Sequence, residues 1–294
     1  NYYEETVNSS VKTEKITDFG IKELDDTYGG IYSDFVSILA PMKGAKTKFS
    51  CYLAHRAAVI HKKRVCVWVL ENNHSLWTNQ IRARHFDYLY NYRSDTDELF
   101  LKLDADHIRK GEYFNDLYRN MELNSFFDLT NNENYGKIQY IDEPFIPETA
   151  INRLEEYYDK WPFDLLIIDY LQYSPDMKGK NKVQTLMYLY QQINTRFLKP
   201  RKIGGIFPGQ IKGSAIQELE MSDEGIVKSL RTIAGESIEL LRTPDINLLL
   251  FAGEEDFATN RMKIIPIPSR NSRLTKPFYI NTSLGVCRFE SMIK

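Results

Sequence analysis

Apolar residues in this chain follow two alternating patterns. Nearly continuous apolar runs predict buried strands at 35–40, 64–70, 137–141, 163–173, 203–207, 246–253, 262–267 and 277–283. Periodic apolar positions predict helices at 48–60, 147–161 and 183–199, and over most of 75–128. Apolar strands separated by helices indicate an α/β fold with a mostly parallel sheet that is covered on both faces.

Details of the pattern refine this picture. In the helix at 48–60, Phe49, Leu53, Ala57 and Ile60 are expected on one buried face. The helix at 147–161 is expected to begin at its proline. The last strands follow one another without helices, which predicts an antiparallel edge.

The pattern also predicts the domain division and where ligands bind. Residues 1–18 are polar and aperiodic, and we expect a linker or N-terminal arm there, followed by a domain over 19–294. Ligands of parallel α/β sheets bind at the carboxyl ends of the strands. The residues that directly follow each strand are therefore the candidates for chemistry.

Composition narrows the class of protein. The 294 residues are 43% hydrophobic and 27% charged, as in ordinary globular proteins. No apolar run reaches the roughly 18 residues of a membrane span, and the first residues do not resemble a signal peptide. Three cysteines at unrelated spacings indicate neither a disulfide framework nor a zinc motif. We therefore expect a cytoplasmic protein without a structural metal or a membrane partner.

Charge is unevenly distributed although the net charge is only -2. Residues 177–213 carry eight Lys or Arg and no acid, and 261–294 carry seven against one acid. Between them, 214–260 carry ten acids against three bases. The basic stretches fit either a solvated face or a polyanion partner, because clustered Lys and Arg neutralise phosphates.

The segment after the first strand, 40–47 (APMKGAKT), has the outline of a phosphate-binding loop. Lys46 and Thr47 occupy the lysine and hydroxyl positions of the pattern, where a helix is predicted to begin. Alanine occupies both glycine positions, and Gly44 lies one place early. If position 45 requires a left-handed backbone, Ala45 costs about 1–2 kcal/mol there. The expected phosphate-binding residues, besides Lys46 and Thr47, are Pro41, Met42, Lys43, Gly44 and Ala45.

Two acids follow other predicted strands. Glu71 comes after the strand at 64–70 and could deprotonate water for attack on a phosphate. Asp169 follows four apolar residues, an arrangement in which the acid holds magnesium. Each acid alone is equally typical of a helix cap or a solvated strand end. Their joint occurrence with the loop outline favours a nucleotide site.

Several segments resemble the DnaB-like replicative helicases, whose motor domain is of the RecA type. The resemblance begins at IDYLQ (168–172) and extends over 19–294. It includes the VLENN segment, the strand that ends at Gln210, and the SRN segment that contains Arg270. A loop that begins with alanine is ordinary in this family.

The resemblance implies a fold, cofactors and roles. It implies a RecA-like core that binds ATP and Mg²⁺, with Lys46 on the phosphates and with Thr47 and Asp169 as the magnesium ligands. Glu71 is the implied catalytic base. Gln210 is the implied sensor of the γ-phosphate.

The resemblance also implies an assembly and partners. Six subunits form a ring, and Arg270 acts as an arginine finger on the neighbour's nucleotide. Single-stranded DNA threads the ring, and a primase or a helicase loader are further expected partners. The tyrosine-, asparagine- and isoleucine-rich composition suits an AT-rich phage or bacterial genome. DNA contacts are expected in the loops at 174–182 and 211–235, from Lys178, Lys180, Lys182, Lys212, Arg231 and Gly235.

Two positions depart from the family pattern, and two other functions stay open. The family has glycine at the position of Ala45 and lysine at that of Pro268. The first alternative is another RecA-type ring ATPase. The second is a degenerate ring subunit that binds nucleotide or DNA without turnover.

Overall fold

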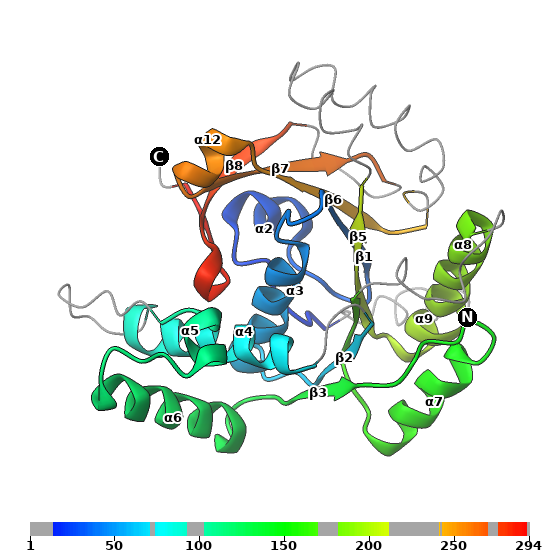
Figure 1. The fold of residues 1–294 in the computed structure, drawn as a ribbon. Coiled ribbons are helices and arrows are strands. Elements are labelled where there is room, and N and C mark those ends of the chain that lie inside the picture. The colour runs from blue at the N-terminus through cyan, green and yellow to red at the C-terminus, as the bar shows by residue number, and fades with distance from the viewer. Residues whose placement is uncertain are drawn as a thin grey trace.

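A nine-stranded sheet runs through the part of the chain that this computed structural model describes, which is residues 14–70, 74–92, 103–169, 182–211, 241, 243–269 and 276–292 (Figure 1). The strands are β1 (Phe35–Ala40), β2 (Val65–Val69), β3 (Ile138–Ile141), β4 (Leu165–Asp169), β5 (Gly204–Gln210), β6 (Ile246–Phe251), β7 (Arg261–Ile267), β8 (Phe278–Ser283) and β9 (Arg288–Ser291). Their order across the sheet is β3-β2-β4-β5-β1-β6-β7-β8-β9.

Helices cover both faces of the sheet, with α2, α3 and α4 on one side and α7, α8 and α9 on the other (Figure 1). Their bounds are α2 Lys22–Tyr28, α3 Lys46–His55, α4 His74–Asp87, α5 Ala105–Lys110, α6 Asp116–Asn131, α7 Ala150–Lys160, α8 Lys182–Gln192, α9 Lys199–Arg201 and α12 Glu254–Ala258. Shorter helical turns are η1 (Arg56–Ile60), η2 (Tyr88–Tyr92), η5 (Ile193–Leu198) and η8 (Leu284–Val286).

The sheet is parallel from β3 to β6 and antiparallel from β6 to β9. Both the predicted α/β fold class and the predicted antiparallel edge are therefore confirmed. In the parallel part, β1 lies between β5 and β6, and β4 lies between β2 and β5. The carboxyl ends of β2, β4, β5 and β1 consequently meet along one edge of the sheet.

The apolar strands are explained by a core on each face. Successive residues of β4 alternate, so that Leu165 and Ile167 join one cluster while Leu166 and Ile168 join the other. The first cluster is completed by α2, α3 and α4, and the second by α7, α8 and η5. Because a strand residue is buried whichever way it points, no polar alternation is left in the sequence.

Two predicted helices differ in detail from the observed ones. Phe49, Leu53 and Ala57 are buried as expected, but Ile60 is 38% exposed. The helix changes from α to π geometry at η1, and this change turns Ile60 away from the core. The helix predicted from Pro147 begins three residues later, at Ala150.

The segment before residue 19 contributes to the core. Ile16 and Thr17 are buried, and Thr17 forms a β-bridge with Ile31. Residues 1–13 lie outside the described part, so the division into an arm and a domain stays a prediction.

The C-terminal hairpin of β8 and β9 packs on the helix that follows β1. The ring of Phe289 lies 5.0 Å from that of Phe49 and 5.4 Å from that of Tyr52. The Ser291 hydroxyl accepts a hydrogen bond from the Lys22 amide at 2.7 Å. Residues from opposite ends of the chain thereby hold α3 in place.

A buried histidine pair links α3 to α4 and α6. Nε2 of His55 lies 3.0 Å from Nδ1 of His85, and Nε2 of His85 lies 3.0 Å from the Asp128 carboxylate. Since a carboxylate only accepts, neutral His85 donates to Asp128 and accepts from His55. Nδ1 of His55 then carries a lone pair, and within the described residues no hydrogen-bond partner faces it.

Acid is expected to destabilise the protein through His55. Burial, with the nearby charges of Arg84, His85 and Arg56, lowers the pKa of His55 well below its ordinary value. Below about pH 6.5 the unfolded chain binds a proton there that the folded chain does not, so the free energy of unfolding falls as the pH falls. This one group contributes up to about 1.4 kcal/mol per pH unit.

Denaturant titrations between pH 7.5 and 5 measure this slope. His55→Asn keeps an N–H donor for His85 and should flatten the slope. The control, His74→Asn, changes a half-exposed histidine and should leave the slope as it is. Equal slopes in the wild-type chain and His55→Asn would contradict the assignment.

Candidate nucleotide site

The loop between β1 and α3 forms a tight turn at the middle of the sheet. The Gly44 amide donates to the Pro41 carbonyl at 2.9 Å, and α3 begins two residues later at Lys46. A Cβ atom at position 44 would lie only 2.8 Å from the Ala40 Cβ and from the Pro41 Cδ. Gly44 is thus required by close packing within the turn.

Left-handed backbone occurs on both sides of Gly44. Lys43 has φ 63° and Ala45 has φ 64°. Ala45 therefore adopts the conformation that glycine usually supplies before the lysine of a phosphate-binding loop. Its methyl group packs with the core cluster beneath α3, and the residue is only 9% exposed.

Ala45→Gly is expected to change the free energy of unfolding by less than about 1 kcal/mol. Relief of the left-handed strain is worth about 1–2 kcal/mol. Against it stand about 0.4–1 kcal/mol of added unfolded-state entropy and about 0.8 kcal/mol of lost methyl burial. Chemical denaturation of both chains measures the difference.

Lys43→Gly is the matched comparison. The backbone at Lys43 is equally left-handed, but the residue is exposed and has no buried methyl group to lose. We expect this variant to be stabilised by about 0.5–1 kcal/mol, since only the entropy term opposes the relief of strain. A clear stabilisation by Ala45→Gly alone would show that the buried methyl does not compensate.

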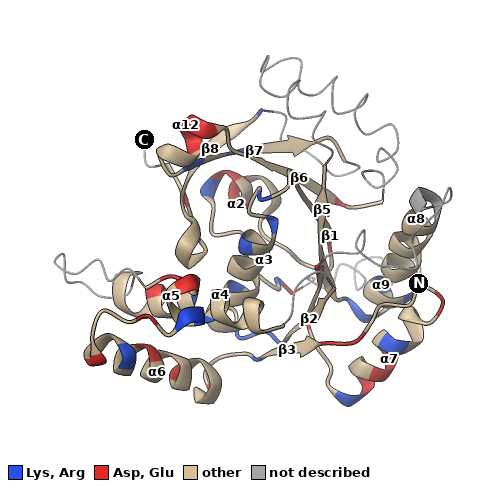
Figure 2. Cartoon of the chain, viewed as in Figure 1, with Lys and Arg blue, Asp and Glu red and all other residues tan. Residues whose placement is uncertain are grey.

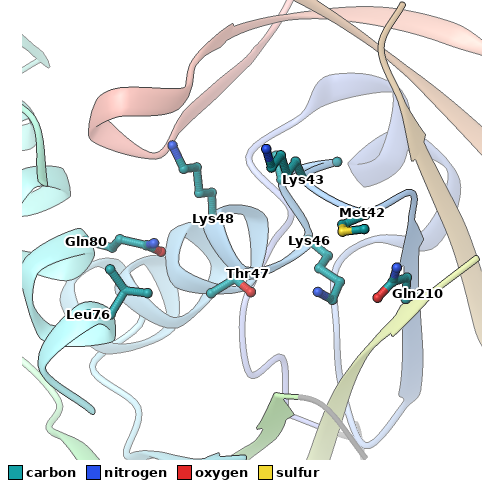
Figure 3. Close-up of a pocket in the computed structure, with 10 residues that line it drawn as sticks. Met42, Lys43, Lys46, Thr47, Lys48, Leu76, Gln80 and Gln210 are labelled. Carbon is teal, nitrogen blue, oxygen red and sulfur yellow. The ribbon is translucent and has the colours of Figure 1, made fainter. Parts of the chain in front are cut away.

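A pocket of about 450 Å³ opens over this loop and the first turn of α3 (Figure 3). It contains three lysines and no carboxylate among its lining residues, which are Met42, Lys43, Gly44, Ala45, Lys46, Thr47, Lys48, Leu76, Gln80 and Gln210. Figure 2 shows this basic character on α3, in contrast to the acidic α12. Lysines beside the N-terminus of a helix favour an anion, because the unpaired N–H groups add to their positive charge.

Two further strand ends reach the same place. Gln210 ends β5, is paired in register with Ala40 of β1, and lies beside Lys46 in Figure 3. Asp169 ends β4, is fully buried, and accepts a hydrogen bond from the Thr47 hydroxyl at 2.9 Å. The sequence-predicted residues Lys46, Thr47, Gln210 and Asp169 are thus brought together, although the structure does not test their roles.

These groups suit the cofactors that the sequence implies. A hydroxyl and a carboxylate, 2.9 Å apart at the start of a helix, are oxygen ligands of the kind that Mg²⁺ prefers. The lysines and the helix N-terminus suit the phosphates of a nucleotide. The donor set therefore fits Mg²⁺ with a nucleoside triphosphate.

Other predicted site residues lie outside the described part of the chain. Val69, the last residue of β2, pairs in register with Asp169, and Glu71 follows two positions later. The side chain of Lys182, the first residue of α8, is not described. The residues outside the described part are Glu71, Lys178, Lys180, Lys212, Arg231, Gly235 and Arg270.

The structure adds residues that sequence patterns did not single out. Leu76 and Gln80 of α4 line the pocket, and the buried Cys51 thiol lies 3.1 Å from the Gln80 side-chain oxygen. The indole N–H of Trp77 donates to Asp169 at 2.9 Å. These residues lie in a segment whose only sequence signal is helical periodicity, and that signal does not identify which of them face a ligand.

Comparisons of sequence and of structure give different results. The sequence matches no protein-family model and no curated protein. None of the helices in the described residues is long and apolar enough to cross a membrane.

Two solved structures are similar over nearly the whole chain. One, described as the ATPase domain of a phage helicase, has a TM-score of 0.72 at 16% identity and is matched over 99% of this chain and 96% of its own. The other is a DnaB-like replicative helicase, reported with its interactions with primase. It has the same TM-score and identity, over 98% of this chain and 67% of its own. The chain therefore has the fold of the RecA-type ATPase domains of DnaB-like replicative helicases.

Proposed function

We propose that this chain is the ATP-hydrolysing motor domain of a DnaB-like replicative DNA helicase. The observation that carries the proposal is the hydrogen bond between Thr47 and Asp169, beside Lys46 and Gln210, in a basic pocket at one edge of the sheet. A loop, a hydroxyl, a carboxylate and an amide from four places in the chain have no packing reason to converge there. Binding a nucleotide with its metal gives them one.

Within this proposal, the described residues bind the substrate and its metal. Lys46 pairs with the β- and γ-phosphate oxygens, and the amides at the start of α3 hold the phosphates from the other side. Thr47 and Asp169 hold Mg²⁺. When bound, Mg²⁺ neutralises negative charge on the phosphate oxygens as the leaving group departs.

Three further side chains take part in hydrolysis. Glu71 accepts a proton from the water that attacks the γ-phosphorus, and ADP departs as the bond to the γ-phosphate breaks. Gln210 contacts the γ-phosphate from the end of β5 and passes its presence on to the residues that follow. Arg270 of the neighbouring subunit stabilises charge in the transition state.

The proposed partners are single-stranded DNA and further copies of the chain. A ring, with six subunits as in the family, places Arg270 beside the neighbour's nucleotide. DNA passes through the ring and is gripped at its phosphates by the lysine-containing loops, so that binding is tolerant of sequence and weakened by salt. Primase or a loader is a further partner of the assembled ring.

ATP turnover by the purified chain, with and without single-stranded DNA, tests the proposal. We expect turnover that requires Mg²⁺ and rises when DNA is added. A preparation that binds ATP and forms rings but shows no turnover would contradict the motor function.

The second candidate is a non-catalytic ring subunit, favoured by Pro268. This residue is exposed just after β7, where the family has a lysine. A missing cation could weaken the link between the neighbouring site and the nucleotide. The left-handed backbone of Ala45 counts against decay of the loop, because the alanine has kept the shape that a phosphate needs.

A further inference from the structure

Two donors converge on one carboxylate oxygen at the end of β4. Oδ2 of Asp169 accepts from the Thr47 hydroxyl and from the Trp77 indole N–H, each at 2.9 Å. Asp169 and Trp77 are both fully buried. The hydroxyl belongs to the loop that binds phosphate, whereas the indole comes from α4 on a different part of the chain.

The two donors differ in how firmly they are held. A threonine hydroxyl can turn about its C–O bond to serve another acceptor. The Trp77 ring is packed in the core cluster among the residues of α3 and the sheet, so the direction of its N–H is fixed by packing. The indole bond therefore keeps the carboxylate in one orientation while the hydroxyl is free to turn toward a cation.

The position of Trp77 also relates α4 to the site. Leu76 and Gln80, its neighbours on α4, line the nucleotide pocket. The helix begins at His74, three residues after Glu71. A bond from this helix to Asp169 thus ties the segment that follows the proposed base to the proposed metal ligand.

We propose that Trp77 is a positioning residue, whose indole N–H orients Asp169 and thereby sets the affinity of the nucleotide site for Mg²⁺. This inference rests on the proposed function, since it requires a nucleotide with its metal in the pocket. Residues that orient metal ligands typically change metal affinity about 10–100-fold when they are replaced.

Trp68→Phe provides a matched control for Trp77→Phe. Trp68 is also buried, at 1% exposure, and its indole N–H also donates one hydrogen bond of 2.9 Å, to the Glu143 carbonyl. Its ring packs in the core cluster on the opposite face of the sheet. Both variants lose the same atoms and one hydrogen bond, but only Trp77→Phe affects Asp169.

The test is ADP binding by calorimetry, in EDTA and at a series of Mg²⁺ concentrations. We expect Trp77→Phe to raise the Mg²⁺ concentration at half-saturation about tenfold or more, with ADP affinity in EDTA unchanged. Trp68→Phe should stay within twofold of the wild-type chain in both measurements. Equal Mg²⁺ dependence in the two variants would overturn the inference.

A second measurement leaves Trp77 intact in case Trp77→Phe does not fold. The chain has three tryptophans, so Trp68→Phe with Trp161→Phe leaves Trp77 as the only indole. Its emission should change when Mg²⁺ is added to the ADP complex, at the half-saturation found by calorimetry. Unchanged emission would overturn the inference while leaving the nucleotide site in place. A wild-type chain that binds no ADP under any condition would overturn the proposed function as well.

Discussion

Lys46→Ala is expected to lower ATP turnover by about 10²–10³-fold. The lysine lies at the first turn of α3 and lines the pocket beside Gln210. It is only 9% exposed, so its charge acts where water screens it weakly. Removing one preorganised donor that faces developing charge typically has an effect of this size.

Lys43→Ala is the control for this experiment. Lys43 lines the same pocket and keeps its left-handed backbone when it is replaced by alanine, but its side chain is exposed. We expect a loss of less than about tenfold, since an exposed charge is screened by solvent. Steady-state turnover at saturating Mg²⁺ compares the two variants. Equal losses would mean that the pocket acts only through its overall charge.

Arg270→Ala is expected to have a still larger effect, about 10³–10⁵-fold in turnover, with the fold and ATP binding retained. This is the range for arginine fingers that act on a neighbour's nucleotide. Arg273→Ala, three positions along the same segment, is the control and should retain most of the activity.

Mixing two inactive variants shows whether Arg270 acts between subunits. Glu71→Gln lacks the base but supplies the arginine, and Arg270→Ala lacks the arginine but supplies the base. If the finger reaches across an interface, mixed rings contain complete sites, and turnover returns when the two are combined. A mixture that stays inactive although mixed rings form would contradict a role in trans.

Sequence patterns predicted those parts of the structure that depend on burial. Strands such as β4 are apolar on both faces because a core covers each, and this leaves a simple signal. The positions that follow the strands could then be assigned to one edge. Lys46, Thr47, Asp169 and Gln210 were brought together by that argument and by the family resemblance.

Features that depend on contacts distant in sequence could not be predicted. Trp77 has the periodicity of any buried helical residue, and only the fold shows that its N–H meets Asp169. Ile60 fits the helical repeat, but a π-turn shifts the repeat by one position. The packing of Phe289 on α3 joins the two ends of the chain, which local patterns do not record.

The left-handed backbone at Ala45 has a consequence for how a nucleotide arrives. A residue with a Cβ holds such a conformation only where its surroundings impose it, and here they do so through the close fit of Gly44 and the buried methyl group. The loop is therefore shaped before any ligand enters, and binding loses little chain entropy in ordering it. Nucleotide association should accordingly be a single fast step, without a slow rearrangement of the loop.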